Sequence, residues 1–202
     1  MNINIRLEKE KDHKEVETLT REAFWDLFQP GCDEHLLAHK LRKAEAFVPG
    51  LDFVAEREDQ IIGNIMYSRA KIVDGKGKEH EVLTFGPLSV LPSHQKLGVG
   101  AALIRHTIKL AEEMGFKAIV IFGHPEYYHR FGFANAETFR ITTSDGANLE
   151  PFMALELYKG ALRGIEGRFH EDAVFKIDPA ELEVFERGFP YREKHVTDTQ
   201  LR

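Results

Sequence analysis

The residues with the clearest chemical potential lie between Leu88 and Ala101, where an apolar run gives way to a short glycine-containing loop and then to a helical pattern. The first backbone N–H groups of a helix lack internal partners, and the helix dipole adds positive potential there. Gly98 and Gly100 allow a ligand to approach this backbone closely. The segment therefore predicts an anion site that is best suited to phosphate groups.

Two common phosphate-binding patterns do not fit this loop. The Walker pattern requires Gly-Lys-Ser/Thr at the helix start, and that sequence is absent. The dinucleotide pattern requires a third glycine three residues after Gly100, where Leu103 stands instead. Gly98 and Gly100 can also serve only to permit tight packing of a strand against a helix. The short pattern alone does not identify the ligand.

Histidine and cysteine residues give little indication of metal chemistry. His35 and His39 share a predicted helical face, but the metalloprotease signature requires Glu after the first His, and Leu36 is there. We interpret both histidines as part of a solvated helix face. Cys32 is the one cysteine, which excludes an intrachain disulfide and zinc sites built on several cysteines. A helix start beside Cys32 would lower the pKa of its thiol, although a bystander role is favoured. No catalytic metal is predicted.

The hydrophobic pattern predicts the elements before the loop. A strand is expected at residues 3–7, then two helices that begin near Asp12 and Asp33, then a hairpin within residues 51–67. Asp12 and Glu15 have the spacing of a capping box. A third β-rich run, at residues 82–91, contains Pro87, so we expect a bulge or an unpaired stretch there.

A strand–helix–strand order follows. The residues from Val99 to Met114 recur at helical spacing and end at Gly115, and Ala118–Phe122 is a continuous apolar run typical of a strand covered on both faces. This order implies a parallel crossover. Further strands are expected near residues 139–143 and 152–157, whereas residues 159–202 are weakly patterned and more polar.

Composition excludes several classes of protein. The chain has 202 residues, 43% hydrophobic and 30% charged, with a formal net charge of -6 and no dense Lys/Arg run, which disfavours nucleic-acid binding. No apolar run approaches the ~20 residues of a membrane helix, and the N-terminus lacks the apolar region of a secretory signal. We therefore expect a protein of the cytoplasm, without a membrane partner.

The longer pattern around the loop is more specific than its glycines. Val90-x-Pro92-x-x-Gln95-x-x-Gly98-x-Gly100 resembles the acyl-coenzyme A pyrophosphate loop of the GNAT acetyltransferases. The hairpin at residues 54–63 resembles the second and third strands of that family, and Tyr128–Phe133 resembles its Tyr-x-x-x-Gly-Phe element. The resemblance covers residues 3–158 in order. Gly123–Tyr128 together with Arg130–Phe133 resembles a bacterial subgroup called YhbS-like.

The resemblance implies a fold and a domain organisation. The expected fold is α/β (α+β): a mixed, mostly antiparallel central sheet flanked by helices, with a parallel crossover between the fourth and fifth strands. Residues 1–158 are expected to form the acetyltransferase core, and residues 159–202 a C-terminal extension packed on it. A homodimer is compatible with this organisation.

The resemblance also assigns roles to residues. Tyr128 matches the usual general acid, which protonates the leaving thiolate. Acetyl-coenzyme A is the implied cosubstrate, with no metal. In the family, one strand pairs with the pantetheine arm of the coenzyme and one loop binds its pyrophosphate. The residues here that match this strand and loop are Leu88, Ser89, Val90, Gln95, Lys96, Leu97, Gly98, Val99, Gly100 and Ala101.

The implied reaction is transfer of an acetyl group to a primary amine, on a small molecule or a protein, by direct attack. The alternative is a non-catalytic acyl-coenzyme A binding or sensing module, and a nucleotide-binding protein is a third reading. The residue that deprotonates the amine is not assigned: Glu81, His124, Glu126 and a water relay stay open. Residues 24–28 (Phe-Trp-Asp-Leu-Phe) fit an acceptor pocket and plain core packing equally well.

Overall fold

The computed structural model of the chain describes residues 3–198 and 200, which divide into two compact units. Unit 1 draws its described residues from Met1–Met66, Gly86–Leu103 and Ala173–Arg202, and unit 2 consists of Tyr67–Phe85 and Ile104–Asp172. The strands β3 and β4 and the helix α3 contribute residues to both units.

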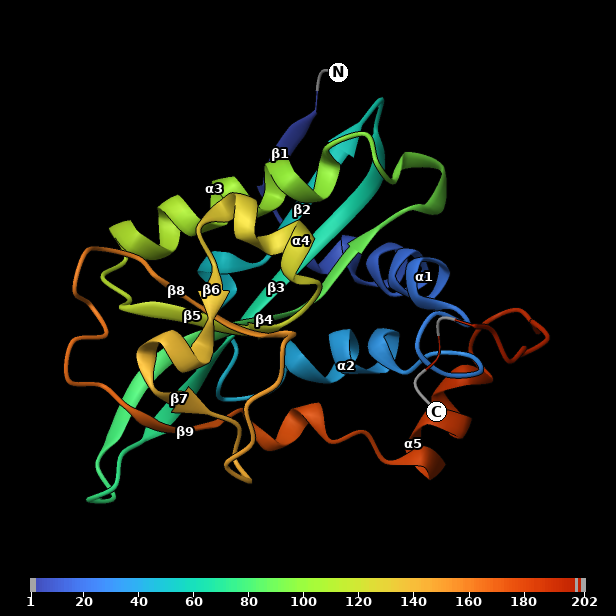
Figure 1. Cartoon of the computed structure of the whole chain (residues 1–202). Coiled ribbons are helices and arrows are strands. Elements are labelled where there is room, and N and C mark those ends of the chain that lie inside the picture. The colour runs from blue at the N-terminus through green and yellow to red at the C-terminus, as the bar shows by residue number, and fades with distance from the viewer. Residues whose placement is uncertain (1–2, 199, 201–202) are drawn as a thin grey trace. The chain divides into compact units, whose positions relative to one another are not determined.

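Figure 1 labels the elements along the chain. The strands are β1 (Asn4–Leu7), β2 (Phe53–Arg57), β3 (Gln60–Val73), β4 (Glu79–Val90), β5 (Ala118–Phe122), β6 (Ala134–Asn135), β7 (Ile141–Thr142), β8 (Phe152–Glu156) and β9 (Gly167–His170). The helices are α1 (His13–Phe24), α2 (Glu34–Leu41), α3 (Val99–Glu113), α4 (Pro125–Tyr128) and α5 (Pro179–Glu186), with short 3-10 turns between them.

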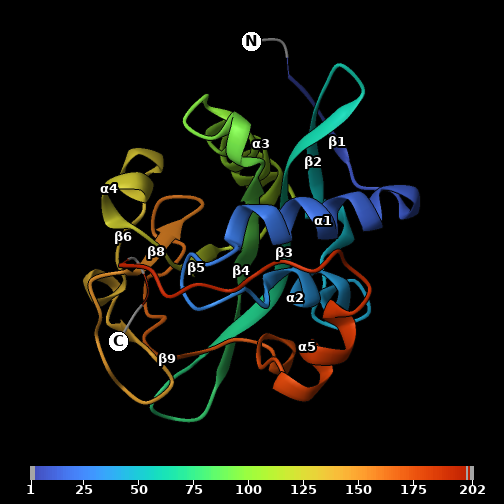
Figure 2. The ribbon, with the colours of Figure 1, turned by 90° about the vertical axis from the view of Figure 1, so that its right-hand side faces the viewer.

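In unit 1, β1, β2 and the first part of β3 pair antiparallel, and the register shifts by a bulge between Ala55 and Glu56. Because of this shift, Ile61 and Gly63 of β3 face opposite sides of the sheet. Val54 and Ile61 pack with Val16 and Leu19 of α1, which lies across β2 and β3 (Figure 2). Gly63, in contrast, faces α3. The predicted hairpin is therefore confirmed, with α1 packed against one of its faces and α3 against the other.

Unit 2 contains the predicted crossover. The part of β4 in this unit pairs parallel with β5, with Leu83 opposite Ile119, and β5 pairs antiparallel with β8. A core of Val82, Val120, Phe152 and other apolar side chains joins these strands. The mixed sheet of the expected fold is thus confirmed. A second parallel pair, between β7 and β9, was not predicted.

The capping predictions were correct in position and wrong in chemistry. Asp12 precedes α1, but its carboxylate makes no bond to that helix: it accepts from the N–H of Lys9 and pairs with Arg6 at 2.6 Å. Glu15 accepts from the N–H of Ile61 at 3.1 Å instead of completing a capping box. Asp33 likewise precedes α2 without a side-chain cap bond. Partners outside the helix compete successfully for the carboxylates of Asp12 and Glu15.

Pro87 lies inside β4, which spans Glu79–Val90 and contains a cis Gly86–Pro87 bond. Two other expectations need correction. Met114 is 49% exposed and follows the end of α3, although its spacing placed it on the buried face. Phe122, at the end of β5, is 51% exposed, so that strand is not covered along its whole length.

Candidate active site

The loop between β4 and α3 presents an open helix N-terminus. Residues 95–98 are exposed, and both Lys96 and Gly98 adopt left-handed backbone conformations, with φ of 62° and 89°. A Cβ at Gly98 would meet no atom within 4 Å, so the conformation, rather than space, favours glycine there. The N–H of Ala102 donates to the carbonyl of Gly98 at 2.9 Å, whereas helix geometry leaves the N–H groups of Val99–Ala101 without helical acceptors.

The end of β4 leaves one edge of its backbone directed away from β3. The N–H of Leu91 donates to the carbonyl of Ile62 on β3 at 3.0 Å. Backbone groups of alternate residues in a strand point to the same edge, so those of Leu88 and Val90 point to the opposite edge. Leu83 of β4 pairs with Ile119 of β5, and Leu88 lies five residues beyond Leu83 along the strand. An extended ligand can therefore add to this edge.

Not every predicted ligand-binding residue presents its side chain. Ser89 is fully buried, and its hydroxyl donates to Oγ1 of Thr20 on α1 at 3.0 Å. The amide of Gln95 folds back and donates to the carbonyl of Val90 at 3.2 Å, which fixes the entry into the loop. Leu97 is 50% exposed. The loop's binding capacity thus resides in its backbone N–H groups more than in its side chains.

Gly63 is a residue of this site that the sequence reasoning did not single out. A Cβ there would lie 2.9 Å from Val99, 3.1 Å from the carbonyl oxygen of Ser89 and 3.2 Å from Leu103. Only glycine lets β3 approach both the start of α3 and the end of β4 this closely. An isolated glycine inside a strand pattern is the signal that could have indicated it.

Tyr128 lies in an aromatic cluster of unit 2. Its ring centroid is 5.9 Å from that of Phe85 and 5.7 Å from that of Phe133, and Gly123 is so close that a Cβ there would clash with the tyrosine ring. Among the described residues no hydrogen-bond partner is present for the Tyr128 hydroxyl. Burial raises the pKa of Tyr128 well above its usual value, so the hydroxyl keeps its proton at neutral pH.

The backbone around Tyr128 explains the spacing of its motif. Gly132 adopts a φ of 93°, a conformation that favours glycine, and ends the turn after α4. This turn returns Phe133, which is 3% exposed, to the ring of Tyr128. Tyr127 is held differently: the guanidinium of Arg130 lies 3.9 Å from its ring centroid. The neighbouring tyrosines therefore have distinct environments.

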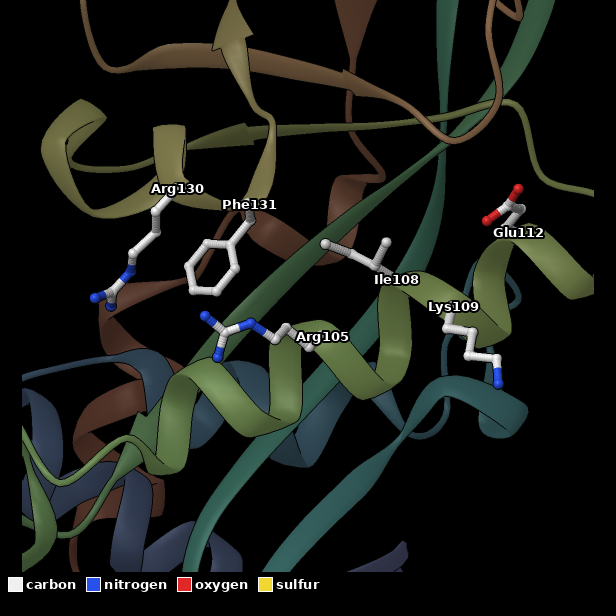
Figure 3. Close-up of a pocket in the computed structure, with 6 residues that line it drawn as sticks. All are labelled: Arg105, Ile108, Lys109, Glu112, Arg130 and Phe131. Carbon is white, nitrogen blue, oxygen red and sulfur yellow. The ribbon is translucent and has the colours of Figure 1, made fainter.

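A cavity of about 320 Å³ lies beside this cluster, within unit 2 (Figure 3). The guanidinium groups of Arg105 and Arg130 lie 5.3 and 5.0 Å from the ring centroid of Phe131, and Lys109 and Glu112 complete the polar lining. Neither arginine is ion-paired to a carboxylate among the described residues. The cavity can accommodate an anionic group.

The interpretation of His35 as a solvated residue was wrong. The side chain is fully buried: Nε2 lies 2.9 Å from a carboxylate oxygen of Glu186, and Nδ1 lies 3.5 Å from the sulfur of Cys32. Burial lowers the pKa of His35. Burial also raises the pKa of the Cys32 thiol, which opposes the effect expected from the helix start. His39 is partly exposed and pairs with Glu17 at 2.8 Å.

The residues left open for the base role are exposed. Glu81 is 60% exposed along its side chain and pairs with Arg69 at 3.4 Å, and His124 and Glu126 are also exposed. The segment 24–28 is divided: Trp25 is buried, whereas Phe28 is 44% exposed. Within the described residues no group of three or more His, Cys, Asp or Glu side chains could hold a metal ion, and no described helix is long and apolar enough to cross a membrane.

Comparison with known proteins gives a consistent result. The family model for the acetyltransferase (GNAT) family matches residues 17–133. The chain is 28% identical over 169 residues to the uncharacterized N-acetyltransferase YhbS of Escherichia coli K12, which covers 83% of this chain and 96% of that protein. It is 35% identical over 99 residues to the uncharacterized N-acetyltransferase YjhQ of the same strain, but spans only 53% of that relative.

Solved structures extend the comparison to the fold. The crystal structure of Escherichia coli YhbS in complex with CoA matches with a TM-score of 0.76 and 26% identity, over 87% of this chain and 92% of that one. A GNAT family acetyltransferase from Brucella melitensis in complex with acetyl-CoA matches with a TM-score of 0.70 and 28% identity, over 87% and 99%. The chain described here belongs to the acetyltransferase (GNAT) family.

Proposed function

We propose that this chain transfers an acetyl group from acetyl-coenzyme A to a primary amine by direct attack of the amine on the thioester. The observation that carries the proposal is the open N-terminus of α3, whose N–H groups at Val99–Ala101 lack helical acceptors in an exposed loop. Such a site suits a pyrophosphate. The related YhbS and Brucella structures hold CoA and acetyl-CoA, which supports the same ligand here.

The described residues fit this ligand in two places. The N–H groups of residues 96–101 would donate to the pyrophosphate, supported by the positive end of the α3 dipole. The backbone groups of Leu88 and the N–H of Val90 would pair with the amides of the pantetheine arm, as an added strand pairs with a sheet edge. The carbonyl of Val90 already accepts from Gln95. Ser89 would contribute through its backbone, since its hydroxyl is bonded to Thr20.

Tyr128 is the proposed proton donor to the leaving thiolate. Its hydroxyl has no hydrogen-bond partner among the described residues and keeps its proton at neutral pH. The same apolar surroundings disfavour a bare thiolate, so a hydrogen bond from this hydroxyl stabilises the negative charge that develops on sulfur. Direct transfer requires the thioester of a coenzyme bound at the α3 loop to reach this hydroxyl.

The proposal is tested by an acceptor screen that monitors release of free thiol from acetyl-coenzyme A. Polyamines, amino acids, aminoglycosides and protein N-termini are suitable acceptors, with binding of acetyl-coenzyme A measured separately by the rise in Tm. Binding together with turnover on an amine supports the enzyme. Binding without turnover on any amine would instead favour the acyl-coenzyme A sensing module.

We also propose the domain organisation expected from the sequence, with residues 1–158 as the family core and residues 159–202 as an extension packed on it. Several contacts within unit 1 support the packing of its last part, including the pair between Arg21 and Glu186. Within unit 2, β9 pairs with β3 and β7.

A further inference from the structure

The segment that joins α1 to α2, with its flanking residues 20–35, lies beside the end of β4 in unit 1. We refer to it as the α1–α2 corner. Thr20, in the last turns of α1, accepts a hydrogen bond from Ser89 of β4 at 3.0 Å. If β4 carries the thioester arm, as the proposed function holds, an acceptor amine can approach the thioester from this corner.

Two of the four carboxylates of the corner, those of Glu22 and Asp26, already have cationic partners. Glu22 pairs with Arg192 at 2.8 Å, and Asp26 pairs with His195 at 3.0 Å. The C-terminal segment also brings in its own carboxylate, that of Glu186, which pairs with Arg21 and His35. These acids are neutralised by residues of the chain itself, so they do not need an external cation.

Asp33 and Glu34, at the start of α2, are different. No Lys, Arg or His nitrogen within the described residues forms an ion pair with either carboxylate, and a carboxylate oxygen of Glu34 accepts from the N–H of Asp33 at 3.1 Å. Both side chains are half-buried. A carboxylate that is partly removed from water and left without a cation provides a favourable site for an ammonium group.

The surroundings of Glu34 also suit proton transfer. Burial, with a smaller contribution from the charge of Asp33, raises the pKa of Glu34 to about 7. The other charged or titratable groups nearby are Cys32 and His35 on the same segment, Arg21 on α1, Glu186 on α5 and Lys194, whose side chain lies against Gly31. Of these, Arg21, His35 and Glu186 are engaged with one another. A base with a pKa near the working pH transfers protons most effectively.

We propose that Glu34 binds the ammonium group of the acceptor and acts as the general base that deprotonates it. The inference rests on the proposed function and assigns the role that the sequence left open. It also defines the substrate class: the acceptor is a cationic alkylamine. The aromatic side chain of Phe28, 44% exposed in the same corner, provides apolar surface for the alkyl part of such a molecule.

The proton balance of the reaction is complete with these groups. A carboxylate oxygen of Glu34 takes one proton from R–NH₃⁺, and the freed lone pair attacks the thioester carbonyl carbon, so that the C–N bond forms and the C–S bond breaks. Tyr128 gives its proton to the departing sulfur and recovers one from the nitrogen of the tetrahedral intermediate. The products are the amide, the free thiol of the coenzyme and one proton, which Glu34 releases to solvent.

The test compares Glu34→Gln with Asp33→Asn, which removes the adjacent half-buried carboxylate. With an alkylamine acceptor, Glu34→Gln should lower kcat/KM by about 10²–10⁴, the usual scale for loss of a general base. The fall in kcat/KM at low pH that the wild type shows should disappear in Glu34→Gln. The Kd for acetyl-coenzyme A should stay within about twofold, since the proposed coenzyme site at the α3 loop does not include this carboxylate, and Asp33→Asn should change kcat/KM by less than about threefold.

A second acceptor distinguishes a base from a structural residue. A hydrazide or alkoxyamine is already unprotonated at neutral pH, so Glu34→Gln should lose about tenfold less activity with it than with an alkylamine. Equal losses with both acceptors, or a wild-type rate and pH profile in Glu34→Gln, would overturn the proposal while wild-type turnover leaves the acetyltransferase function intact. Absence of wild-type turnover on every amine would overturn both.

Discussion

The α3 loop and the α1–α2 corner are both polar sites, yet they are built from different kinds of sequence information. The loop acts through backbone N–H groups that one continuous stretch, residues 95–102, positions by its own conformation. The corner acts through side chains whose environment is set by partners far along the chain, such as Glu186, which is 151 residues from His35.

This difference separates the proposed site that binds the coenzyme from the proposed site that selects the acceptor. A site that binds phosphate through backbone N–H groups tolerates variation in side chains. An acceptor site must differ between proteins, and a corner whose charges are balanced by a C-terminal segment can change with that segment. The comparison predicts that changes in the loop will affect the coenzyme, whereas changes in the corner will affect the acceptor and the stability of unit 1.

The largest expected effect is on the rate of acetyl transfer. Tyr128→Phe removes one hydroxyl and little volume from the aromatic cluster, so folding and coenzyme binding should survive while kcat falls by about 10²–10⁴. Single-turnover thiol release measures the change. Tyr127→Phe is the matched control, because that ring is held by Arg130, and it should lose far less. The reverse ranking would move the acid role to Tyr127.

The buried pair between α1 and α5 should give the next largest effect, on stability. Glu186→Gln keeps the shape of the side chain but leaves the guanidinium of Arg21, which is 4% exposed, without its carboxylate. We expect a loss of about 2–4 kcal/mol in the free energy of unfolding, since removing one partner of a buried ion pair leaves the other charge buried without a partner. Thermal and urea unfolding measure it.

Glu181→Gln provides the control on the same helix. Glu181 pairs with Lys40, but its side chain is 46% exposed, so the pair is screened by water and its loss should cost less than about 1 kcal/mol. Equal destabilisation by both variants would mean that α5 is held by its general charge and not by the buried pair.

The loop should respond through ligand affinity instead. Gly98→Val places a β-branched residue at a φ of 89°, so the backbone must change and its N–H groups move. We expect the Kd for acetyl-coenzyme A to rise by about tenfold or more. Gly77→Val, at a φ of 80° in the turn between β3 and β4, introduces the same strain outside the loop and should leave the Kd unchanged. A parallel loss in both variants would point to general destabilisation.

The same contrast explains what the sequence could predict. The hairpin, α3, β5 and the parallel crossover follow from local periodicity, because each element buries a regular apolar face. The helix α5 could not be predicted this way: Val184 is 65% exposed, and the helix is fixed instead by Glu186 and by Phe185 and Phe189 against His35. The strand β6 contains two residues, too few for a pattern, whereas β7 lies within the strand expected near residues 139–143.

The site shows the same division. The position and backbone character of the α3 loop were readable because glycine spacing and a helix start occur within one segment. The burial of His35 and the unpaired state of Glu34 were not, because both depend on which residues the C-terminal segment brings to the corner. The ligand-contacting roles of residues 88–101 and of Tyr128, and a cytoplasmic location, remain predictions.

The smallest expected effect concerns a third charged cluster, near the end of α2 that is opposite the corner. There Arg42 pairs with Glu8 at 2.7 Å and with Glu17 at 3.0 Å, and Asn64 donates to Asp52 at 3.1 Å. Asp52 is 6% exposed. Burial, together with a hydrogen bond to Glu8, raises the pKa of Asp52 from 3.8 to about 9. Like the corner, this cluster is assembled from residues far apart in sequence, but its carboxylates satisfy one another.

The consequence is a stability that falls with pH. The folded state holds a proton on Asp52 that the unfolded chain releases above pH 3.8, so this proton's contribution is fully present below that pH and is lost progressively until about pH 9. Asp52→Asn keeps a hydrogen-bond donor toward Glu8 and removes the titration. Its Tm should be close to or below that of the wild type at pH 5 and above it at pH 9, because only the wild type loses the contribution of this proton between the two pH values. Thermal melts at both pH values measure the crossover. Parallel Tm curves for the two proteins would show that Asp52 is ionised in the fold and that Arg42 neutralises all three carboxylates.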